Sequence, residues 1–448
     1  MLSALSLGLQ MGLTTAMPMP AALVSIERHS QFELDRYTRQ IEQDGGWWLE
    51  MEDRLLVAAP AMRLSGLLAH ERVLEHLGAV RPEDFALQSR ACGIDEHAQL
   101  PPVASAGRFA LVRTPGGVLP IKPPAISEWK LLVPNQTLAK DLNARGLIAG
   151  AKRAVDPQIQ MRVDALDTQR WFDAMTTLAT YDRSSYGTGA YPEIDQARDW
   201  LKAEFQLLGM TVTTPTFSFG SGPTSVENVV AKLTGSTYPD ELVIIGGHYD
   251  SRQTGSNPVN TPGAEDNATG CAGVLEAARV FAQFPPQRSM IFVCFAGEEQ
   301  GLYGGYAYVQ SLVDSAQLDN VKLAVIMDMI GYSGDTDLDV LLETSSTLST
   351  VFTSFQTMAA TYVPELRVIT TTSWWGSDHV PFIEQNVPSL LTIENDYGSY
   401  PHYHKSTDLP ANVTRAQEMG GGILKMNIAV LTDAAGFERP ILRDGFEN

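Results

Sequence analysis

The chain has 448 residues, more than an ordinary single domain, and this length predicts two domains. A hydrophobic fraction of 44% is enough to build a buried core in each of them. The formal net charge of −20 argues against a protein that binds nucleic acid or an anionic membrane surface, because such binding requires a basic face.

The first 24 residues are apolar and end in small side chains, which is typical of a signal peptide and its cleavage region. The apolar run is too short to span a membrane, and no other stretch of the sequence reaches that length. We therefore expect residues 1–24 to be a signal peptide and the protein to be secreted or periplasmic. One feature departs from this pattern, because no Lys or Arg precedes the apolar run, and the alternative that it is not a signal stays open.

Residues 25–155 carry short apolar stretches, for example 109–112 and 131–133, which Pro and Gly separate. This pattern predicts a small mixed domain that contains strands. The segment shows no metal-ligand spacing and no catalytic motif. Its role stays open between a propeptide that assists folding and an accessory binding module.

Residues 160–437 alternate between strands and helices. The expected strands lie at 229–233, 242–245, 290–295, 323–327 and 389–393, and the expected helices at 170–178, 194–208, 272–284, 347–362 and 416–434. Apolar strands without polar alternation are buried on both faces of a sheet. The pattern therefore predicts an α/β fold with a mostly parallel, doubly wound sheet and helices on both faces. Residues 438–448 are expected to form a C-terminal tail.

The chain contains three cysteines, Cys92, Cys271 and Cys294, and no CxxC pair. This argues against a thiolate zinc site or a redox motif. Cys271 falls at an expected helix start and Cys294 in an expected strand, so we expect both to be buried free thiols. A disulfide between them is the alternative.

Residues of the types that bind zinc follow the expected strands one after another. They are His248, Asp266, Glu299, Asp328 and His404. In open α/β sheets, sites form in the crevice outside the carboxyl ends of the strands. We therefore expect these five side chains to meet in one crevice.

Two imidazoles and three carboxylates are a suitable donor set for two zinc ions that share one bridging carboxylate. Glu298 and Glu299 are adjacent, and neighbouring side chains on an extended backbone point in different directions. One of them is therefore expected to bind metal, while the other takes a proton from the attacking water. Asp250, two residues after His248, is placed to hold the free N–H of the imidazole.

Six motifs, taken in order, resemble the dizinc aminopeptidase family, whose secreted members include bacterial leucyl aminopeptidases and aminopeptidase S. The resemblance covers about residues 164–436. The motifs are HYDS at 248–251, GAEDNATG at 263–270, AGEEQG at 296–301, MDMIG at 327–331, SDH at 377–379 and YHKSTD at 403–408.

The resemblance implies a role for each ligand. One zinc ion would be bound by His248 and Asp328, the other by Glu299 and His404, and Asp266 would bridge them. His402 is a competing ligand two residues before His404, but the His-x-x-x-Asp spacing from His404 to Asp408 matches the family and favours His404.

The resemblance also implies roles around the metals. Glu298 would be the general base, Tyr403 resembles a tyrosine that hydrogen-bonds the oxyanion in some members, and the Asp266–Asn267 peptide bond would be cis. The remaining expected site residues are Asp250, Asp378 and Asp408, which would support the ligands, and Met329 and Ile330, which would line the substrate pocket.

The function implied is that of a monomeric aminopeptidase with two Zn²⁺ per chain, which removes apolar N-terminal residues from peptides with a free N-terminus. A different zinc enzyme on the same scaffold, such as a glutaminyl cyclase or a carboxypeptidase, is the alternative. A receptor or scaffold without activity is disfavoured, because the ligand set is complete and such a cluster of acids is unstable without cations.

Overall fold

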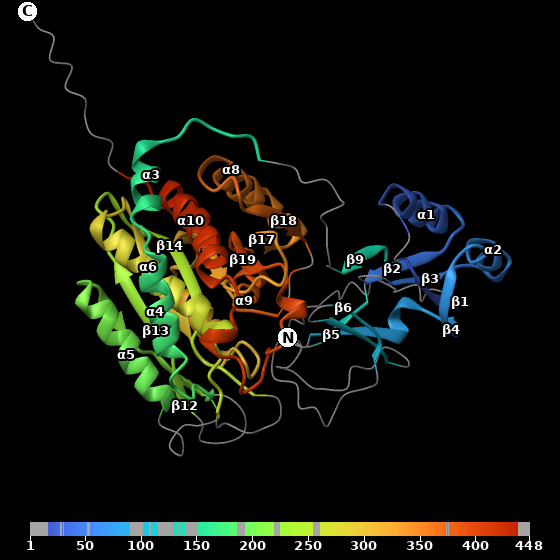
Figure 1. Ribbon diagram of the computed structural model, residues 1–448, viewed down its shortest axis with the longest axis horizontal. Helices are drawn as coiled ribbons and strands as arrows, with labels where there is room; N and C mark the ends of the chain where they lie inside the picture. Colours follow the sequence, from blue (N-terminus) through green and yellow to red (C-terminus); the bar gives the residue numbers. More distant parts are fainter. Residues whose placement is uncertain are drawn as a thin grey trace, which may run out of the picture.

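The computed structural model forms two bodies, a larger one that follows residue 150 and a smaller one before it (Figure 1). Cys92 and the tail 438–448 lie outside the described residues. The structure describes residues 17–26, 29, 31–51, 54–89, 102–106, 109–114, 129–132, 134–138, 150–185, 193–218, 225–253, 260–372, 374 and 376–437.

The smaller body contains a five-stranded sheet of order β4-β1-β3-β2-β9, a four-stranded sheet of order β6-β7-β5-β8, and two helices. This confirms the expected small mixed domain. The elements are β1 (Met19–Ser25), α1 (Gln31–Gln43), β2 (Trp47–Met51), β3 (Arg54–Ala58), α2 (Ala61–Leu67), β4 (Arg72–Val80), β5 (Phe85–Ser89), β6 (Pro102–Ala106), β7 (Phe109–Arg113), β8 (Trp129–Leu131) and β9 (Gln136–Leu138).

Strand β1 contains residues that the sequence analysis placed at the end of a leader. It lies between β3 and β4, and its residues Ala22 and Val24 are fully buried. The expected boundary after residue 24 therefore runs through a strand of the sheet. The leader itself stays a prediction.

The larger body is built on an eight-stranded sheet of order β10-β13-β15-β14-β16-β19-β17-β18. Its four central strands, β15, β14, β16 and β19, run parallel to one another. The strands are β10 (Thr211–Thr213), β13 (Val229–Leu233), β14 (Tyr238–His248), β15 (Arg288–Phe295), β16 (Val321–Met327), β17 (Asp339–Glu343), β18 (Arg367–Thr371) and β19 (Ser389–Glu394). A separate hairpin joins β11 (Thr216–Ser218) and β12 (Ser225–Glu227).

The helices cover both faces of this sheet. The connections β14–α6–β15 and β15–α7–β16 run in opposite directions along the sheet, so right-handed crossovers place α6 and α7 on opposite faces. In agreement, α6 packs with α4, α5 and α10, whereas α7 packs with α9. This confirms the doubly wound α/β fold. The helices are α3 (Pro157–Asp164), α4 (Thr168–Leu178), α5 (Glu193–Leu207), α6 (Gly270–Gln283), α7 (Tyr303–Asp314), α8 (Phe352–Tyr362), α9 (Val380–Glu384) and α10 (Ala416–Ala435).

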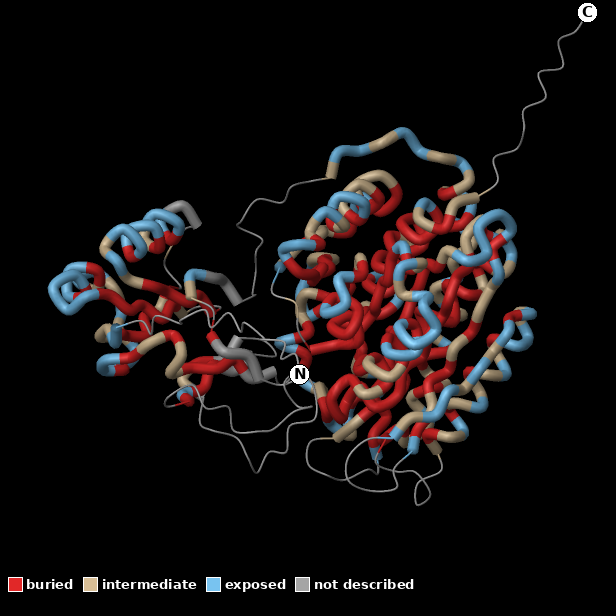
Figure 2. Tube along the Cα trace, turned by 180° about the vertical axis from the view of Figure 1, so that it is seen from behind, coloured by how far each residue is buried: buried red, intermediate tan, exposed pale blue. Residues whose placement is uncertain are grey.

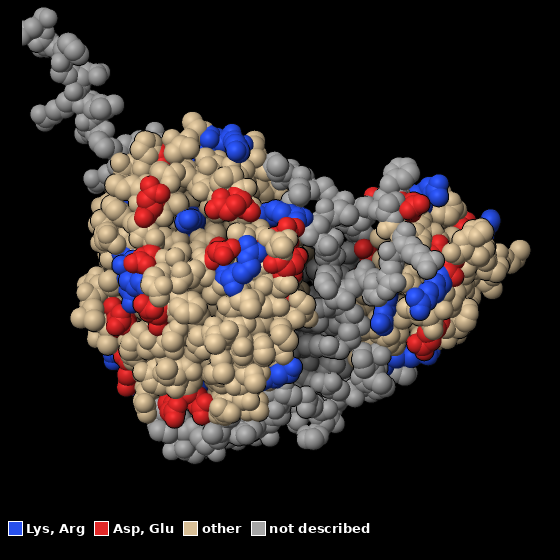
Figure 3. All heavy atoms as spheres, viewed as in Figure 1, with Lys and Arg blue, Asp and Glu red and all other residues tan. Residues whose placement is uncertain are grey.

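Buried residues concentrate along the central strands, as Figure 2 shows. On the face shown in Figure 3, acidic and basic side chains stand in small groups among uncharged residues. No described helix combines the length and the apolar character that crossing a membrane requires.

Cys271 and Cys294 form a disulfide, so the expectation of free thiols is wrong. Helix α6 packs against β15, and the two Cα atoms come within 5.8 Å, a separation that suits a disulfide. This proximity arises from the tertiary packing of a helix on a strand, which residue spacing alone did not reveal.

Candidate metal centre

The five expected ligands all lie at the carboxyl ends of the parallel strands. His248 is the last residue of β14, Asp328 follows β16, and Glu299 lies four residues beyond the end of β15. Asp266 lies in the irregular turn 264–269 that leads into α6, and His404 lies between β19 and α10. The parallel direction of the four strands brings these segments together, as expected from the sequence.

Asp266 lies between two groups of donors. Its Oδ1 is 3.4 Å from His248 Nε2, and its Oδ2 is 3.0 Å from His404 Nε2. Asp328 Oδ1 is 3.4 Å from the same nitrogen of His248, while Glu299 Oε2 is 3.1 Å from that of His404. The side chains thus form two triads that share Asp266, and in each triad the ligand atoms are close enough to hold one metal ion.

These donors are buried and suit divalent cations. Among the described residues, His248 Nε2, Asp328 Oδ1 and both carboxylate oxygens of Glu299 are buried without a hydrogen bond. Leaving such atoms without a partner is costly, so a cation is the natural occupant of the space between them. Imidazole nitrogens with carboxylate oxygens are a donor set that zinc accepts.

The His248 ring is oriented for this role. Its Nδ1–H donates to the backbone carbonyl of Asp250 at 3.1 Å, which leaves the lone pair of Nε2 directed towards Asp266 and Asp328. The sequence analysis assigned this contact to the carboxylate of Asp250, but that group lies at 3.5 Å.

Charge dominates the environment of the two triads. Burial alone would lower the pKa of His248, but the carboxylates of Glu298 and Asp328 raise it well above its usual value. Burial alone would raise the pKa of Asp266, but the neighbouring imidazoles of His248 and His404 lower it below its usual range. The cluster holds more carboxylates than imidazoles, so positive charge would stabilise it.

The two adjacent glutamates differ in position. Glu298 Oε2 lies 3.8 Å from His248 Nε2, whereas Glu299 approaches His404. Burial raises the pKa of Glu298 well above its usual value and that of Glu299 to about 7. The two side chains therefore face different triads, as the sequence analysis expected.

Groups distant in the sequence hold the backbone of Asp266, the residue that both triads share. Asp408 accepts hydrogen bonds from the backbone N–H groups of Glu265 and Asp266 at 2.9 and 3.1 Å, and from the Tyr400 hydroxyl at 2.7 Å. The Asp266–Asn267 peptide bond is cis, as expected. Asp408 thus supports the loop that carries Asp266.

The other expected site residues fall in three environments. Tyr403 stacks on the His404 ring with centroids 3.8 Å apart, which places it beside the second triad. Asp378 is fully buried, and burial raises its pKa well above the usual value.

Met329 is 3% exposed, whereas Ile330 is fully buried and points towards Gly273 of α6. Both residues pack in the core of the larger body, and their role in a substrate pocket stays a prediction.

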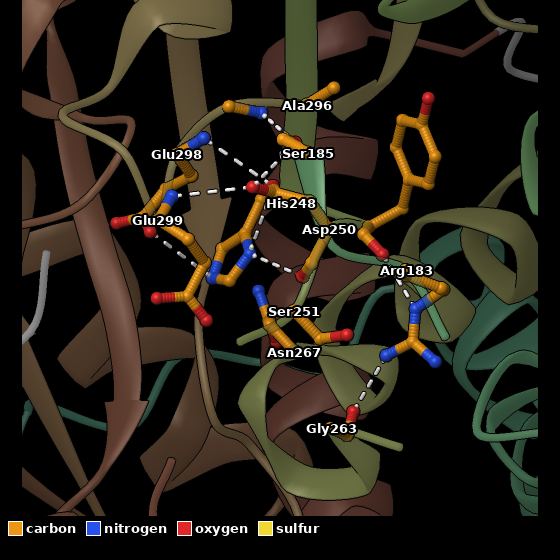
Figure 4. Close-up of polar contacts among 12 residues, drawn as sticks. Arg183, Ser185, His248, Asp250, Ser251, Gly263, Asn267, Ala296, Glu298 and Glu299 are labelled. Atoms are coloured by element: carbon orange, nitrogen blue, oxygen red, sulfur yellow. Dashed lines mark hydrogen bonds and ion pairs between the residues drawn. The ribbon is translucent and has the colours of Figure 1, made fainter. Parts of the chain in front are cut away.

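Two residues near the site were not singled out from the sequence. The buried guanidinium of Arg183 donates to the carbonyls of Tyr249, Pro262 and Gly263 at 2.6–2.8 Å and so ties together the loops that follow β14 (Figure 4). Ser185 donates to Asp250. Serine and arginine are common residue types, and the only sequence signal was their occurrence between two expected helices.

Comparisons with known proteins agree with this geometry. Residues 228–425 match the model of the family described as Peptidase family M28. Proteins named "Probable zinc metalloprotease" from Pyrenophora teres f. teres and Pyrenophora tritici-repentis are 34% and 38% identical over 48% and 37% of this chain. The chain spans only 47% and 40% of the length of these two relatives.

Several solved structures share the fold. The Legionella pneumophila LapA aminopeptidase superposes with a TM-score of 0.54 at 19% identity, covering 79% of this chain and 99% of that one. An aminopeptidase from Aneurinibacillus sp. strain AM-1 gives 0.52 at 17% over 63% and 97%. A glutaminyl cyclase from an Acidobacteriales bacterium gives 0.51 at 18% over 60% and 95%, so the fold alone does not select one reaction.

Proposed function

We propose that this chain is a zinc-dependent aminopeptidase that binds two zinc ions, because residues 228–425 match the model of Peptidase family M28. It would remove apolar N-terminal residues from peptides with a free N-terminus. The observation that carries the proposal is the position of Asp266, whose two carboxylate oxygens face His248 on one side and His404 on the other.

The two triads provide separate sites for the two ions. His248, Asp266 and Asp328 would hold one, and Asp266, Glu299 and His404 the other. When bound, the zinc ions would supply Lewis acidity that activates the attacking water and polarises the scissile carbonyl.

Glu298 would move the proton. It is 2% exposed and not part of either triad, yet its Oε2 lies 3.8 Å from His248 Nε2. Burial raises its pKa, which makes the carboxylate a stronger base than a glutamate in water. It would take a proton from the attacking water and deliver it to the nitrogen of the leaving amine.

The acidic surroundings would also attract the α-ammonium group of a peptide. This attraction supports an aminopeptidase over an enzyme that binds a C-terminal carboxylate.

One observation favours the enzyme that binds a C-terminal carboxylate. Arg252 donates from Nη1 to the backbone carbonyl of Glu299 at 3.3 Å, and this places a cation beside the second triad. A carboxypeptidase is therefore the second candidate.

Leucine p-nitroanilide, N-acetyl-leucine p-nitroanilide and N-blocked peptides with a free C-terminus distinguish these functions. The proposal predicts cleavage of only the first by the zinc-loaded protein. Glu298→Gln should lower kcat by about 100-fold or more and retain zinc, because general acid–base catalysis contributes about 10²–10⁴-fold. Cleavage of the blocked peptides alone would instead support the carboxypeptidase, and full activity of the variant would remove Glu298 from the mechanism.

We also propose that the protein acts as a monomer in a secreted or periplasmic location. The disulfide between Cys271 and Cys294 supports the location, because disulfides persist mainly in oxidising compartments.

A further inference from the structure

The turn that carries Glu298 begins with Gly297, directly after β15 and Ala296. Gly297 has a φ of +67°, a conformation that residues with a Cβ rarely adopt. The two glutamates that follow point to different triads, so their orientation depends on how this turn is held. The hydrogen bonds of its backbone N–H groups therefore decide where the proposed base lies.

Two of these N–H groups meet the carboxylate of Asp250. The N–H of Glu298 donates to Oδ1 at 3.4 Å, and the N–H of Glu299 donates to Oδ2 at 3.3 Å. The same carboxylate has its Oδ1 3.5 Å from His248 Nδ1. Asp250 thus contacts the backbone of both glutamates, of which Glu299 is a proposed metal ligand.

Ser185 contacts both the Asp250 carboxylate and the first residue of the turn. Its hydroxyl donates to Asp250 Oδ2 at 3.0 Å and accepts from the N–H of Gly297 at 3.0 Å (Figure 4). The side chain is fully buried, so solvent does not readily replace it. Ser185 lies 112 residues before Gly297 and outside the range 228–425 that matches the family.

The lengths of these hydrogen bonds indicate which group holds the turn and the Asp250 carboxylate most firmly. Hydrogen bonds from N–H groups to oxygen are normally about 2.7–3.2 Å long, and they weaken beyond that range. The two amide contacts to Asp250 exceed it, whereas the bonds of Ser185 lie within it. The hydroxyl of Ser185 is therefore the best-placed group to fix both the carboxylate and the start of the turn.

We propose that Ser185 is a positioning residue, which orients Glu298 and the proposed ligand Glu299 through Gly297 and Asp250 without touching the substrate. The role in catalysis rests on the function proposed above. The role in orienting the metal ligands does not require that the substrate be a peptide.

The test compares S185A with S289A in the full-length chain. Ser289 is an equally buried serine at the opposite end of β15, where it donates to the carbonyl of Pro239 at 2.7 Å and accepts from the N–H of Gly235 at 3.0 Å. It therefore controls for the loss of a buried hydroxyl with two hydrogen bonds. Zinc affinity is measured by competition with a chelating indicator, and kcat and KM with leucine p-nitroanilide.

S185A should weaken zinc binding and lower kcat, each by about 10- to 100-fold, as the loss of groups that orient metal ligands does. KM should change little, and S289A should match the wild type in zinc affinity and kcat. Wild-type zinc affinity in S185A, or an equal loss in S289A, would overturn the proposal. If S185A does not fold, S185C gives the same comparison, because a thiol is a weak hydrogen-bonding group of similar size.

Different results would refute the proposed function and the proposed role of Ser185. A wild-type chain that binds zinc but cleaves no peptide would remove the proposed function, and the zinc titration would still decide the role of Ser185.

Discussion

The carboxylate of Asp408 accepts a hydrogen bond from the backbone N–H of Asp266 at 3.1 Å, although 142 residues separate them. Its other oxygen accepts from the N–H of Glu265 and from the Tyr400 hydroxyl. Asp408 thus fixes the backbone of the residue that the two triads share, and the position of the proposed bridge depends on a residue four positions after His404.

This relationship predicts the effect of Asp408→Asn. The amide of asparagine keeps one acceptor oxygen, but its NH₂ group replaces the other. This NH₂ group would face a donor, either a backbone N–H or the Tyr400 hydroxyl, so a hydrogen bond is lost. We expect zinc affinity to fall by about 10- to 100-fold, as for other residues that orient metal ligands. Isothermal titration with zinc measures this directly, and unchanged affinity would show that the loop holds Asp266 without Asp408.

Removal of metal should destabilise the fold. The buried carboxylates of both triads would lose the positive charge that offsets their repulsion, so we expect a chelator to lower Tm and added zinc to restore it. A ligand at about 1,000 times its Kd stabilises a protein by about 4 kcal/mol. Differential scanning calorimetry with and without chelator gives the result. Equal Tm values would indicate that the triads do not bind metal in the folded state.

Arg183→Lys should lower the free energy of unfolding by about 2–4 kcal/mol, because lysine cannot reach several buried carbonyls at once. The carbonyls concerned belong to Tyr249, Pro262 and Gly263. Arg415→Lys is the control, since Arg415 pairs with the exposed Glu418, and such surface ion pairs contribute about 1 kcal/mol or less. Chemical denaturation compares the two variants. Equal losses in the free energy of unfolding would contradict the stabilising role that we assign to the buried hydrogen bonds of Arg183.

Much of the site could be predicted because its signals are local. His248 ends one apolar strand and Asp328 directly follows another, and the carboxyl ends of parallel strands lie at one edge of the sheet. Glu298 and Glu299 could be separated by the direction of adjacent side chains. These arguments require only residue types and an expected sheet.

The remainder depends on packing between segments that are distant in the sequence. Cys271 and Cys294 pair because α6 lies on β15, and Ser185 reaches the turn at Gly297 from another part of the chain. Strands β17 and β18 were also missed, because β17 begins at the charged residue Asp339 and both strands are short. Ile330 belongs to the MDMIG motif but packs beside Gly273 of α6, a contact that the motif alone does not reveal.

The structure also predicts how the free energy of unfolding depends on pH, through a residue outside the two triads, Asp339. Asp339 is 2% exposed, and burial, with the charges of Asp396 and Asp335, raises its pKa to about 6. The folded state therefore binds more protons than the unfolded state between about pH 4 and pH 6, and stability falls as pH rises through this range. Above it, the charged carboxylate destabilises the fold.

Asp339→Asn removes this effect. We expect the variant to gain up to about 3 kcal/mol over the wild type at pH 8, because the pKa is raised from 3.8 to about 6 and each pKa unit corresponds to about 1.4 kcal/mol, and to gain little near pH 4. Denaturation of both proteins at several pH values gives the difference, in which the pH dependence of metal binding cancels. A difference that stays constant with pH would show that Asp339 titrates normally.

The number of zinc ions bound per chain tests the central claim most directly. Elemental analysis of the folded protein, loaded with zinc and dialysed, should give two zinc ions per chain. Asp266→Asn should bind fewer, because it removes the carboxylate that both triads share. A folded wild-type protein that binds one zinc ion or none, or an Asp266→Asn variant that still binds two, would contradict a centre in which Asp266 bridges two ions.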